Sequence, residues 1–314
     1  MTPLEPSLQG FPRPFARYFA ATRPAFLSVT LAGALIGLGS ASADGLAIDA
    51  LKALLTILFA LVAHAGANVV NDYYDALNGS DAGNQQRLFP FTGGSRFIQN
   101  GVLSLRETKR FGYGLLAAVI PAGLWLTAHS ASGLIGIGLA GLLIGWAYSA
   151  PPLQLMARGV GEAAIVGGWL LVALGTDFVQ RGELAALPLV AGLPFALLVA
   201  AILYLNQFPD AQADAAAGKR TLIVRLGVRQ ARWGYVALTA AAYLWLAAAV
   251  LLGMLPALCA VALLPAALSA KAGRGLLQNA AEPARLAPAI QATIAAANLN
   301  GLLMALALAL AHRF

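Results

Sequence analysis

Charged residues and cysteine are scarce in this chain of 314 residues. Asp, Glu, Lys and Arg together make up 11% of it, hydrophobic residues make up 60%, and the mean hydropathy is +0.75. A soluble domain of this length does not need so much apolar surface, whereas a polytopic membrane protein does. The single cysteine, Cys259, excludes a disulfide within one chain and a metal centre with several thiolate ligands.

The chain also lacks a recognisable signal peptide and a basic soluble face. The first sixteen residues contain four prolines and no apolar core of a signal sequence, so we expect residues 1–16 to form a cytoplasmic N-terminal segment. The net charge of +7 is distributed between hydrophobic runs, which argues against nucleic acid as a partner.

Nine apolar runs are long enough to be candidate membrane spans. They cover residues 25–42, 51–70, 112–128, 134–150, 163–179, 187–205, 236–252, 256–270 and 290–311. The sequence therefore predicts an all-α polytopic membrane protein with nine transmembrane helices, in a single domain over residues 1–314.

The distribution of basic residues predicts how these spans are oriented. If the N-terminus is cytoplasmic, all but three of the 20 Lys and Arg residues fall on the cytoplasmic side, the exceptions being Lys52, Arg181 and Arg313. We therefore expect a multi-pass protein of a bacterial cytoplasmic (inner) membrane with its N-terminus in the cytoplasm.

Two acidic motifs end two of the apolar runs. Asn68, Asp72 and Asp75 follow the run 51–70 and have the spacing i, i+4, i+7, which places them on one face of a helix. Asn206, Asp210 and Asp214 follow the run 187–205 and have the spacing i, i+4, i+8. Both runs cross the membrane outward to inward, so both motifs end on the cytoplasmic side, where they can face each other across one cavity.

These residues offer oxygen ligands alone, which favours Mg²⁺ or Ca²⁺ over zinc or copper. Mg²⁺ commonly bridges carboxylates to phosphate, so we predict a Mg²⁺ site that binds a diphosphate. The alternative is that the acids only mark helix ends at the membrane interface. It explains one motif, but it does not explain two motifs of matching design.

Basic and glycine-rich segments near the two motifs can supply phosphate contacts. Thr92-Gly93-Gly94-Ser95-Arg96 offers backbone N–H groups, hydroxyls and a guanidinium, although a Gly-Gly pair is also typical of a turn. Lys219 and Arg220 follow Asp214, and their alternative role is topology or contact with anionic lipid. Arg158, in the third cytoplasmic segment, is a further candidate.

The same cytoplasmic segment contains Tyr148, followed by Pro151-Pro152, which ends the helix abruptly. A tyrosine aimed into the cavity can shield a carbocation by a cation–π interaction of roughly 2 kcal/mol when desolvated. A tyrosine of the interfacial belt is the alternative. We expect His64, one turn before Asn68, to make an interhelical hydrogen bond rather than to act as a base.

Together, these motifs resemble the UbiA superfamily of intramembrane aromatic prenyltransferases. The Asn71-to-Asp75 form followed by Thr92-Gly93-Gly94-Ser95 looks most like the MenA branch, the 1,4-dihydroxy-2-naphthoate polyprenyltransferases of menaquinone synthesis. The resemblance implies nine helices around a central cavity, with Mg²⁺ as cofactor. Pro209 departs from the branch, whose members often have arginine there, and this leaves the acceptor open.

The resemblance also implies roles for individual residues. Metal ligands would be Asn68, Asp72, Asp75, Asp210 and Asp214, and the four aspartates together with Tyr148 would be catalytic. Diphosphate ligands would be Asn68, Arg96, Lys219 and Arg220, and its position in the sequence adds Arg158 to this set.

We therefore expect Mg²⁺-dependent transfer of a polyprenyl group from a prenyl diphosphate to an aromatic acceptor similar to dihydroxynaphthoate, on the cytoplasmic side and in contact with membrane lipid. Another aromatic or lipid acceptor is an alternative. An ion-coupled transporter is a second, but it would be expected to carry its carboxylates near mid-bilayer. A phosphotransferase of the CDP-alcohol type would carry a motif that this sequence lacks.

Overall fold

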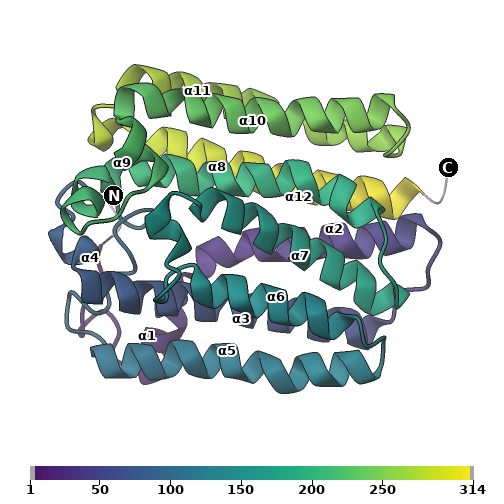
Figure 1. Ribbon diagram of the computed structural model, residues 1–314, viewed down its shortest axis with the longest axis horizontal. Helices are drawn as coiled ribbons and strands as arrows, with labels where there is room; N and C mark the ends of the chain where they lie inside the picture. Colours follow the sequence, from purple (N-terminus) through teal and green to yellow (C-terminus); the bar gives the residue numbers. More distant parts are fainter. Residues whose placement is uncertain (1–3, 312–314) are drawn as a thin grey trace.

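The protein is described by a computed structural model over residues 4–311, and this range contains helices and loops but no strand (Figure 1). The α-helices are α1 (Pro14–Ala21), α2 (Ser28–Ala43), α3 (Ala50–Asn78), α4 (Ser80–Gly83), α5 (Leu105–Ala128), α6 (Leu134–Ala147), α7 (Gly161–Arg181), α8 (Leu187–Ala216), α9 (Leu222–Leu226), α10 (Val228–Leu251), α11 (Ala266–Asn279) and α12 (Ala287–Ala311). Four short 3₁₀ helices are η1 (Pro24–Leu27), η2 (Leu155–Arg158), η3 (Ala257–Leu263) and η4 (Pro283–Arg285).

The long helices run side by side along one axis, as expected for a membrane bundle (Figure 1). Within the described residues, eight helical segments are long and apolar enough to span a bilayer, and α6, at 14 residues, is a shorter ninth apolar helix. The prediction of an all-α polytopic protein built on nine apolar helices is thereby confirmed.

Several helices extend beyond the apolar runs that predict them. Helices α3 and α8 have 29 and 30 residues, so both acidic motifs lie inside helices rather than after them. Helix α5 begins at Leu105 because Ser104 and Glu107 form a capping box that starts the helix before its apolar part. These extensions bring polar residues to one end of the bundle on rigid backbone.

Close helix packing depends on small residues, as is usual in membranes. A Cβ atom at Gly37 of α2 would collide with the Ala173 carbonyl of α7, and one at Gly39 would collide with the Ala305 carbonyl of α12. Around these contacts lies a buried cluster that includes Ile36, Phe195 and Leu308. Helix α2 is therefore fixed against α7 and α12, next to the cavity described below.

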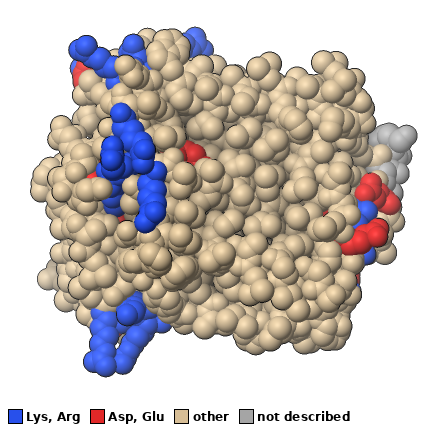
Figure 2. All heavy atoms as spheres, in the orientation of Figure 1, with Lys and Arg blue, Asp and Glu red and all other residues tan. Residues whose placement is uncertain are grey.

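Charge is distributed asymmetrically along the bundle axis. Lys and Arg side chains gather at the left end of Figure 2, which is the end where Figure 1 places α4 and α9. A smaller group at the other end includes the ion pairs of Arg181 with Asp44 and Asp177. The end of the bundle that carries α4 and α9 also carries both acidic motifs.

Candidate active site

A cavity of about 570 Å³ runs inside the bundle. Its lining residues come from α2, α3, α5, α6, α7, α8 and the loops after α3 and α8. Polar residues line its end near α4, and apolar residues such as Phe59, Val119, Leu142 and Val172 line its depth. The cavity therefore joins a charged mouth to an interior suited to a hydrocarbon chain.

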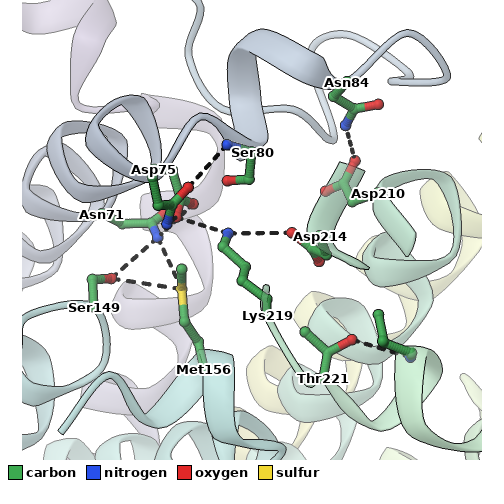
Figure 3. Close-up of polar contacts among 12 residues, drawn as sticks. Asn71, Asp75, Ser80, Asn84, Ser149, Met156, Asp210, Asp214, Lys219 and Thr221 are labelled. Carbon is green, nitrogen blue, oxygen red and sulfur yellow. Dashed lines mark hydrogen bonds and ion pairs between the residues drawn. The ribbon is translucent and has the colours of Figure 1, made fainter. Parts of the chain in front are cut away.

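Helix α3 brings the first acidic motif to this mouth, where Asp75 lines the cavity and Asp72 does not. Asp72 and Asp75 are 3% and 7% exposed, and Asp72 Oδ1 accepts a hydrogen bond of 3.2 Å from the Ser95 backbone N–H. Asn71 donates to Asp75 Oδ2 at 3.1 Å and to Ser149 Oγ at 3.1 Å (Figure 3). Asn71 therefore orients Asp75, a role that the sequence analysis did not assign.

Asn68 lines the cavity one turn deeper than Asp72. Its Nδ2 atom donates to the Thr22 carbonyl at 3.0 Å, which joins α3 to the segment between α1 and η1. Its predicted role as a metal or diphosphate ligand stays a prediction.

Lys219 joins the two acidic motifs. Its Nζ lies 2.7 Å from Asp75 Oδ1 and 3.2 Å from Asp214 Oδ1, and its side chain is only 7% exposed (Figure 3). Burial alone would lower the pKa of Lys219, but the Asp75 and Asp214 carboxylates outweigh burial and raise this pKa above its ordinary value. The expectation that the motifs meet across one cavity agrees with this geometry.

The loop after α3 adds an acid that the sequence analysis missed. Asp81, in the short helix α4, is 6% exposed, and burial together with the carboxylates of Asp75 and Asp72 raises its pKa well above the ordinary value. A Cβ atom at Gly94, where φ is +74°, would collide with Asp81 Oδ2 and lie 3.2 Å from Asp72 Oδ1. Glycine at this position therefore lets the Gly-Gly loop pack directly against the carboxylates.

The second acidic motif also receives a partner from the loop after α4. Asn84 Nδ2 donates to Asp210 Oδ1 (Figure 3), and Asn84 is 2% exposed. The sequence signal for both Asp81 and Asn84 was their position within nine residues of Asp75, in a segment rich in Gly, Ser and Asn.

Three of the predicted diphosphate ligands do not line the cavity. Arg158 and Arg220 are exposed, and the buried Arg96 donates through Nη1 to the Asp81 carbonyl and lies 3.7 Å from Glu5. Arg23, by contrast, lines the cavity and makes no ion pair with any other residue in the range 4–311. Its Nη2 donates to the Phe91 carbonyl at 3.4 Å. From the sequence, Arg23 is expected only to be one of the basic residues on the cytoplasmic side.

A second polar layer lies one helical turn deeper in the cavity. Tyr148 lines the cavity, which favours the first of its two predicted placements, and its catalytic role stays a prediction. Gln207 lines the cavity too, and its Nε2 donates to Glu162 Oε1 at 2.7 Å. His64 Nδ1 lies 2.7 Å from Thr30 Oγ1, so it makes the expected interhelical hydrogen bond between α3 and α2.

The chemistry of the donor set fits a hard divalent cation. The five carboxylates of Asp72, Asp75, Asp81, Asp210 and Asp214 offer only oxygen, and Asp81 Oδ2 is buried without a hydrogen-bond partner in the described part of the chain. Over residues 4–311, no three acidic, histidine or cysteine side chains are already arranged as a metal site. Lys219 pairs with both Asp75 and Asp214, so its ammonium group occupies the space between the two motifs in this arrangement.

Comparison with known proteins gives consistent matches along the chain. The sequence profile of the UbiA prenyltransferase family matches residues 27–310. The 1,4-dihydroxy-2-naphthoate octaprenyltransferase of Escherichia coli (strain K12) is 28% identical over 94% of this chain and 96% of its own length. The enzyme of the same name from Mycobacterium tuberculosis (strain ATCC 25618 / H37Rv) is 31% identical over 73% of this chain and 76% of its own length.

Among solved structures, a UbiA homolog from Archaeoglobus fulgidus bound to DMAPP and Mg²⁺ superposes with a TM-score of 0.65. It covers 91% of this chain and 99% of its own, at 18% sequence identity. At this identity the likeness concerns the fold, which the two chains share.

Proposed function

The chain belongs to the UbiA prenyltransferase family, and we propose that it transfers a polyprenyl group from a prenyl diphosphate to 1,4-dihydroxy-2-naphthoate. Membership makes the chain a prenyltransferase of the membrane, and the two named relatives support the acceptor. The observation that carries the proposal is the cavity itself, which connects a mouth lined by four carboxylates (Asp75, Asp81, Asp210 and Asp214) and Lys219 to an apolar interior.

The carboxylates would hold Mg²⁺ together with the diphosphate. Asp81 joins Asp72, Asp75, Asp210 and Asp214 in this set because its carboxylate is buried beside theirs and lacks another partner within residues 4–311. When bound, Mg²⁺ neutralises negative charge that develops on the leaving diphosphate. Asp75, Asp72 and Asp210 disfavour the charged form of Asp81, so the set is expected to bind a cation strongly.

Two basic side chains are placed to bind the diphosphate. Lys219 can exchange its carboxylate partners for phosphate oxygens, and Arg23 offers a guanidinium at the cavity wall. The Gly93-Gly94 loop lines the same mouth, although the Ser95 N–H that follows it is already donated to Asp72. These groups would stabilise the leaving group as the allylic C–O bond breaks.

The deeper layer would then receive the acceptor. Asn71, Tyr148 and Gln207 line the cavity, and the first carbon of the prenyl group would lie beside them. The aromatic face of Tyr148 can shield an allylic cation. Glu162 holds the Gln207 amide through Nε2, which leaves Gln207 Oε1 to accept a hydrogen bond from an acceptor hydroxyl. The apolar walls exclude water, which would otherwise trap the cation.

We also propose that residues 1–314 form one domain in a bacterial inner membrane, with N-terminus and active site facing the cytoplasm. The asymmetry of basic residues supports this orientation, because they gather at the end that carries the acidic mouth (Figure 2).

The test is prenyl transfer by membranes that contain the protein, supplied with Mg²⁺, a polyprenyl diphosphate and dihydroxynaphthoate, with the product identified by mass spectrometry. Asp72→Ala and Asp210→Ala should each lower the rate about 100-fold or more. Asp44→Ala, which removes an acid at the opposite end of the bundle, is the control and should retain the rate. Transfer to 4-hydroxybenzoate in place of dihydroxynaphthoate would contradict the acceptor assignment, and wild-type rates in both site variants would contradict the metal assignment.

A further inference from the structure

We propose that Glu5, in the segment before α1, is a positioning residue that holds Asp81 and Asn84 in the acidic mouth through two arginines. The proposal rests on the function proposed above, because it concerns the same site. It assigns a role to a segment that precedes residues 27–310, the part of the chain that matches the family profile.

Glu5 makes three contacts with the loop that follows α4. Its Oε1 accepts from Arg87 Nε and lies 2.7 Å from Arg87 Nη2. Its Oε2 accepts from Asn100 Nδ2 at 3.1 Å and lies 3.7 Å from Arg96 Nε. One carboxylate thus connects three positions of a loop that is irregular over most of its length.

Both arginines then reach back to the backbone of the acidic site. Arg87 Nη1 donates to the Asn84 carbonyl at 2.7 Å, and Arg96 Nη1 donates to the Asp81 carbonyl. Asn84 holds Asp210 through its side chain, and Asp81 brings its own carboxylate to the site. Glu5 is therefore connected to Asn84 and Asp81, two residues of the acidic mouth, through one intervening arginine each.

Apolar contacts also hold the N-terminal segment against the same loop. The rings of Phe11 and Phe97 lie 5.2 Å apart, and Phe97 is buried in a cluster with Ala21, Val102 and Leu103. Asn100 Nδ2 also donates to the Pro6 carbonyl at 3.0 Å. The segment is docked on the loop at two places, one polar and one apolar.

Charge explains why the carboxylate matters. Burial, and then the neighbouring Arg87 guanidinium, lower the pKa of Arg96, which means that the two cations repel each other. Arg96 also has a φ of +67°, a conformation that costs free energy for a residue other than glycine. Glu5 supplies the negative charge that lets both arginines remain close to each other and bonded to the backbone of the site.

The experiment compares Glu5→Gln with Glu282→Gln in the full chain. Glu282 pairs with Arg285 at 3.0 Å on the surface, so its variant removes an ion pair of the same kind at a distance from the cavity. We expect Glu5→Gln to raise about tenfold the Mg²⁺ concentration that gives half-maximal transfer, with little change in the rate at saturating Mg²⁺. Glu282→Gln should leave both quantities unchanged.

A second measurement does not depend on turnover. Hydrogen exchange of backbone amides in residues 81–96, in Mg²⁺-free protein, should be faster in Glu5→Gln than in wild type or Glu282→Gln. Unchanged exchange and an unchanged Mg²⁺ requirement would overturn the role of Glu5. Wild-type protein that transfers no prenyl group would instead contradict the proposed function, while the exchange result would still report on Glu5.

A double-mutant cycle separates positioning from a general effect on stability. If Glu5 acts through Arg87, the double variant with Glu5→Gln and Arg87→Gln should need little more Mg²⁺ than Arg87→Gln alone. If the double variant instead needs the Mg²⁺ concentration given by multiplying the two single-variant effects, the connection through Arg87 would be overturned.

Discussion

At the scale of single residues, the acidic mouth contains carboxylates whose surroundings are unfavourable without the cation that we propose they bind. Asp72, Asp75 and Asp81 are each at least 93% buried, and Asp81 Oδ2 has no hydrogen-bond partner among the residues that the structure describes. The buried carboxylates also repel one another, and the positive charge of Lys219 offsets this repulsion at Asp75 and Asp214. The carboxylates proposed to bind the cation therefore lower the stability of the cation-free protein.

This opposition gives a prediction for Asp81→Asn. The substitution removes a carboxylate that burial and its neighbours disfavour, so it should stabilise the Mg²⁺-free protein, by about 1 kcal/mol or more. It should also lower kcat/KM for transfer about 100-fold, because a proposed metal ligand is lost. Thermal unfolding in the presence of a chelator and a transfer assay measure the two effects.

The control is Asp49→Asn at the beginning of α3, where the side chain caps the helix by accepting from the Lys52 N–H. Asparagine caps helices about as well as aspartate, so neither stability nor transfer should change. A loss of both stability and transfer in Asp81→Asn would show that Asp81 is structural.

At the scale of helices, apolar runs predicted most of the architecture because hydrophobicity is the dominant signal in a membrane chain. The runs did not predict that α3 and α8 continue through their polar motifs to Asn78 and Ala216. Hydropathy falls where a helix leaves the bilayer, but the backbone hydrogen bonds of that helix do not stop there.

The sequence predicted the residues of the acidic site only where they lie on one regular helix. The i, i+4, i+7 spacing identified Asp72 and Asp75, because these residues share one regular helix. It could not identify Asp81, since Gly79 at φ +81° ends α3 and breaks the periodicity before Asp81. It also could not show that Arg96 is held by Glu5, 91 residues earlier in the chain, because that contact depends on tertiary packing.

Helix α6 makes the clearest prediction at this scale, because its glycines open the apolar part of the cavity. Gly138 and Gly141 line the cavity, and a Cβ atom at either position would meet nothing within 4 Å. Gly138→Leu and Gly141→Leu should therefore place a side chain in the space proposed for the isoprenoid. The ratio of kcat/KM for a long prenyl diphosphate to that for geranyl diphosphate should fall about tenfold.

Gly136→Leu is the matched control on the same helix. Its Cβ atom also has open space, but Gly136 does not line the cavity. An equal change in all three variants would indicate disturbed helix packing, and no change in Gly138→Leu or Gly141→Leu would show that the chain takes another path.

At the scale of the whole molecule, the protein is a helical bundle whose two ends differ in charge. The end that carries α4 and α9 holds the acidic mouth and most of the visible basic residues (Figures 1 and 2). The other end carries the C-terminal ends of α2 and α7, where Arg181 pairs with Asp44 and Glu183 follows α7. Because substrates with a diphosphate group are made in water, the charged mouth should open to the compartment that supplies them.

The chain is well suited to a direct test of this orientation, because Cys259 is its single cysteine and is buried. In a Cys259→Ala background, Arg110→Cys would place a thiol at the exposed start of α5, on the basic end, and Glu183→Cys would place one in the exposed loop after α7. If the basic end faces the cytoplasm, a membrane-impermeant maleimide should label Arg110→Cys in inverted vesicles and Glu183→Cys in right-side-out vesicles. The opposite pattern would put the mouth on the outer face, and labelling of both thiols from one side would contradict a bundle that spans the membrane between them.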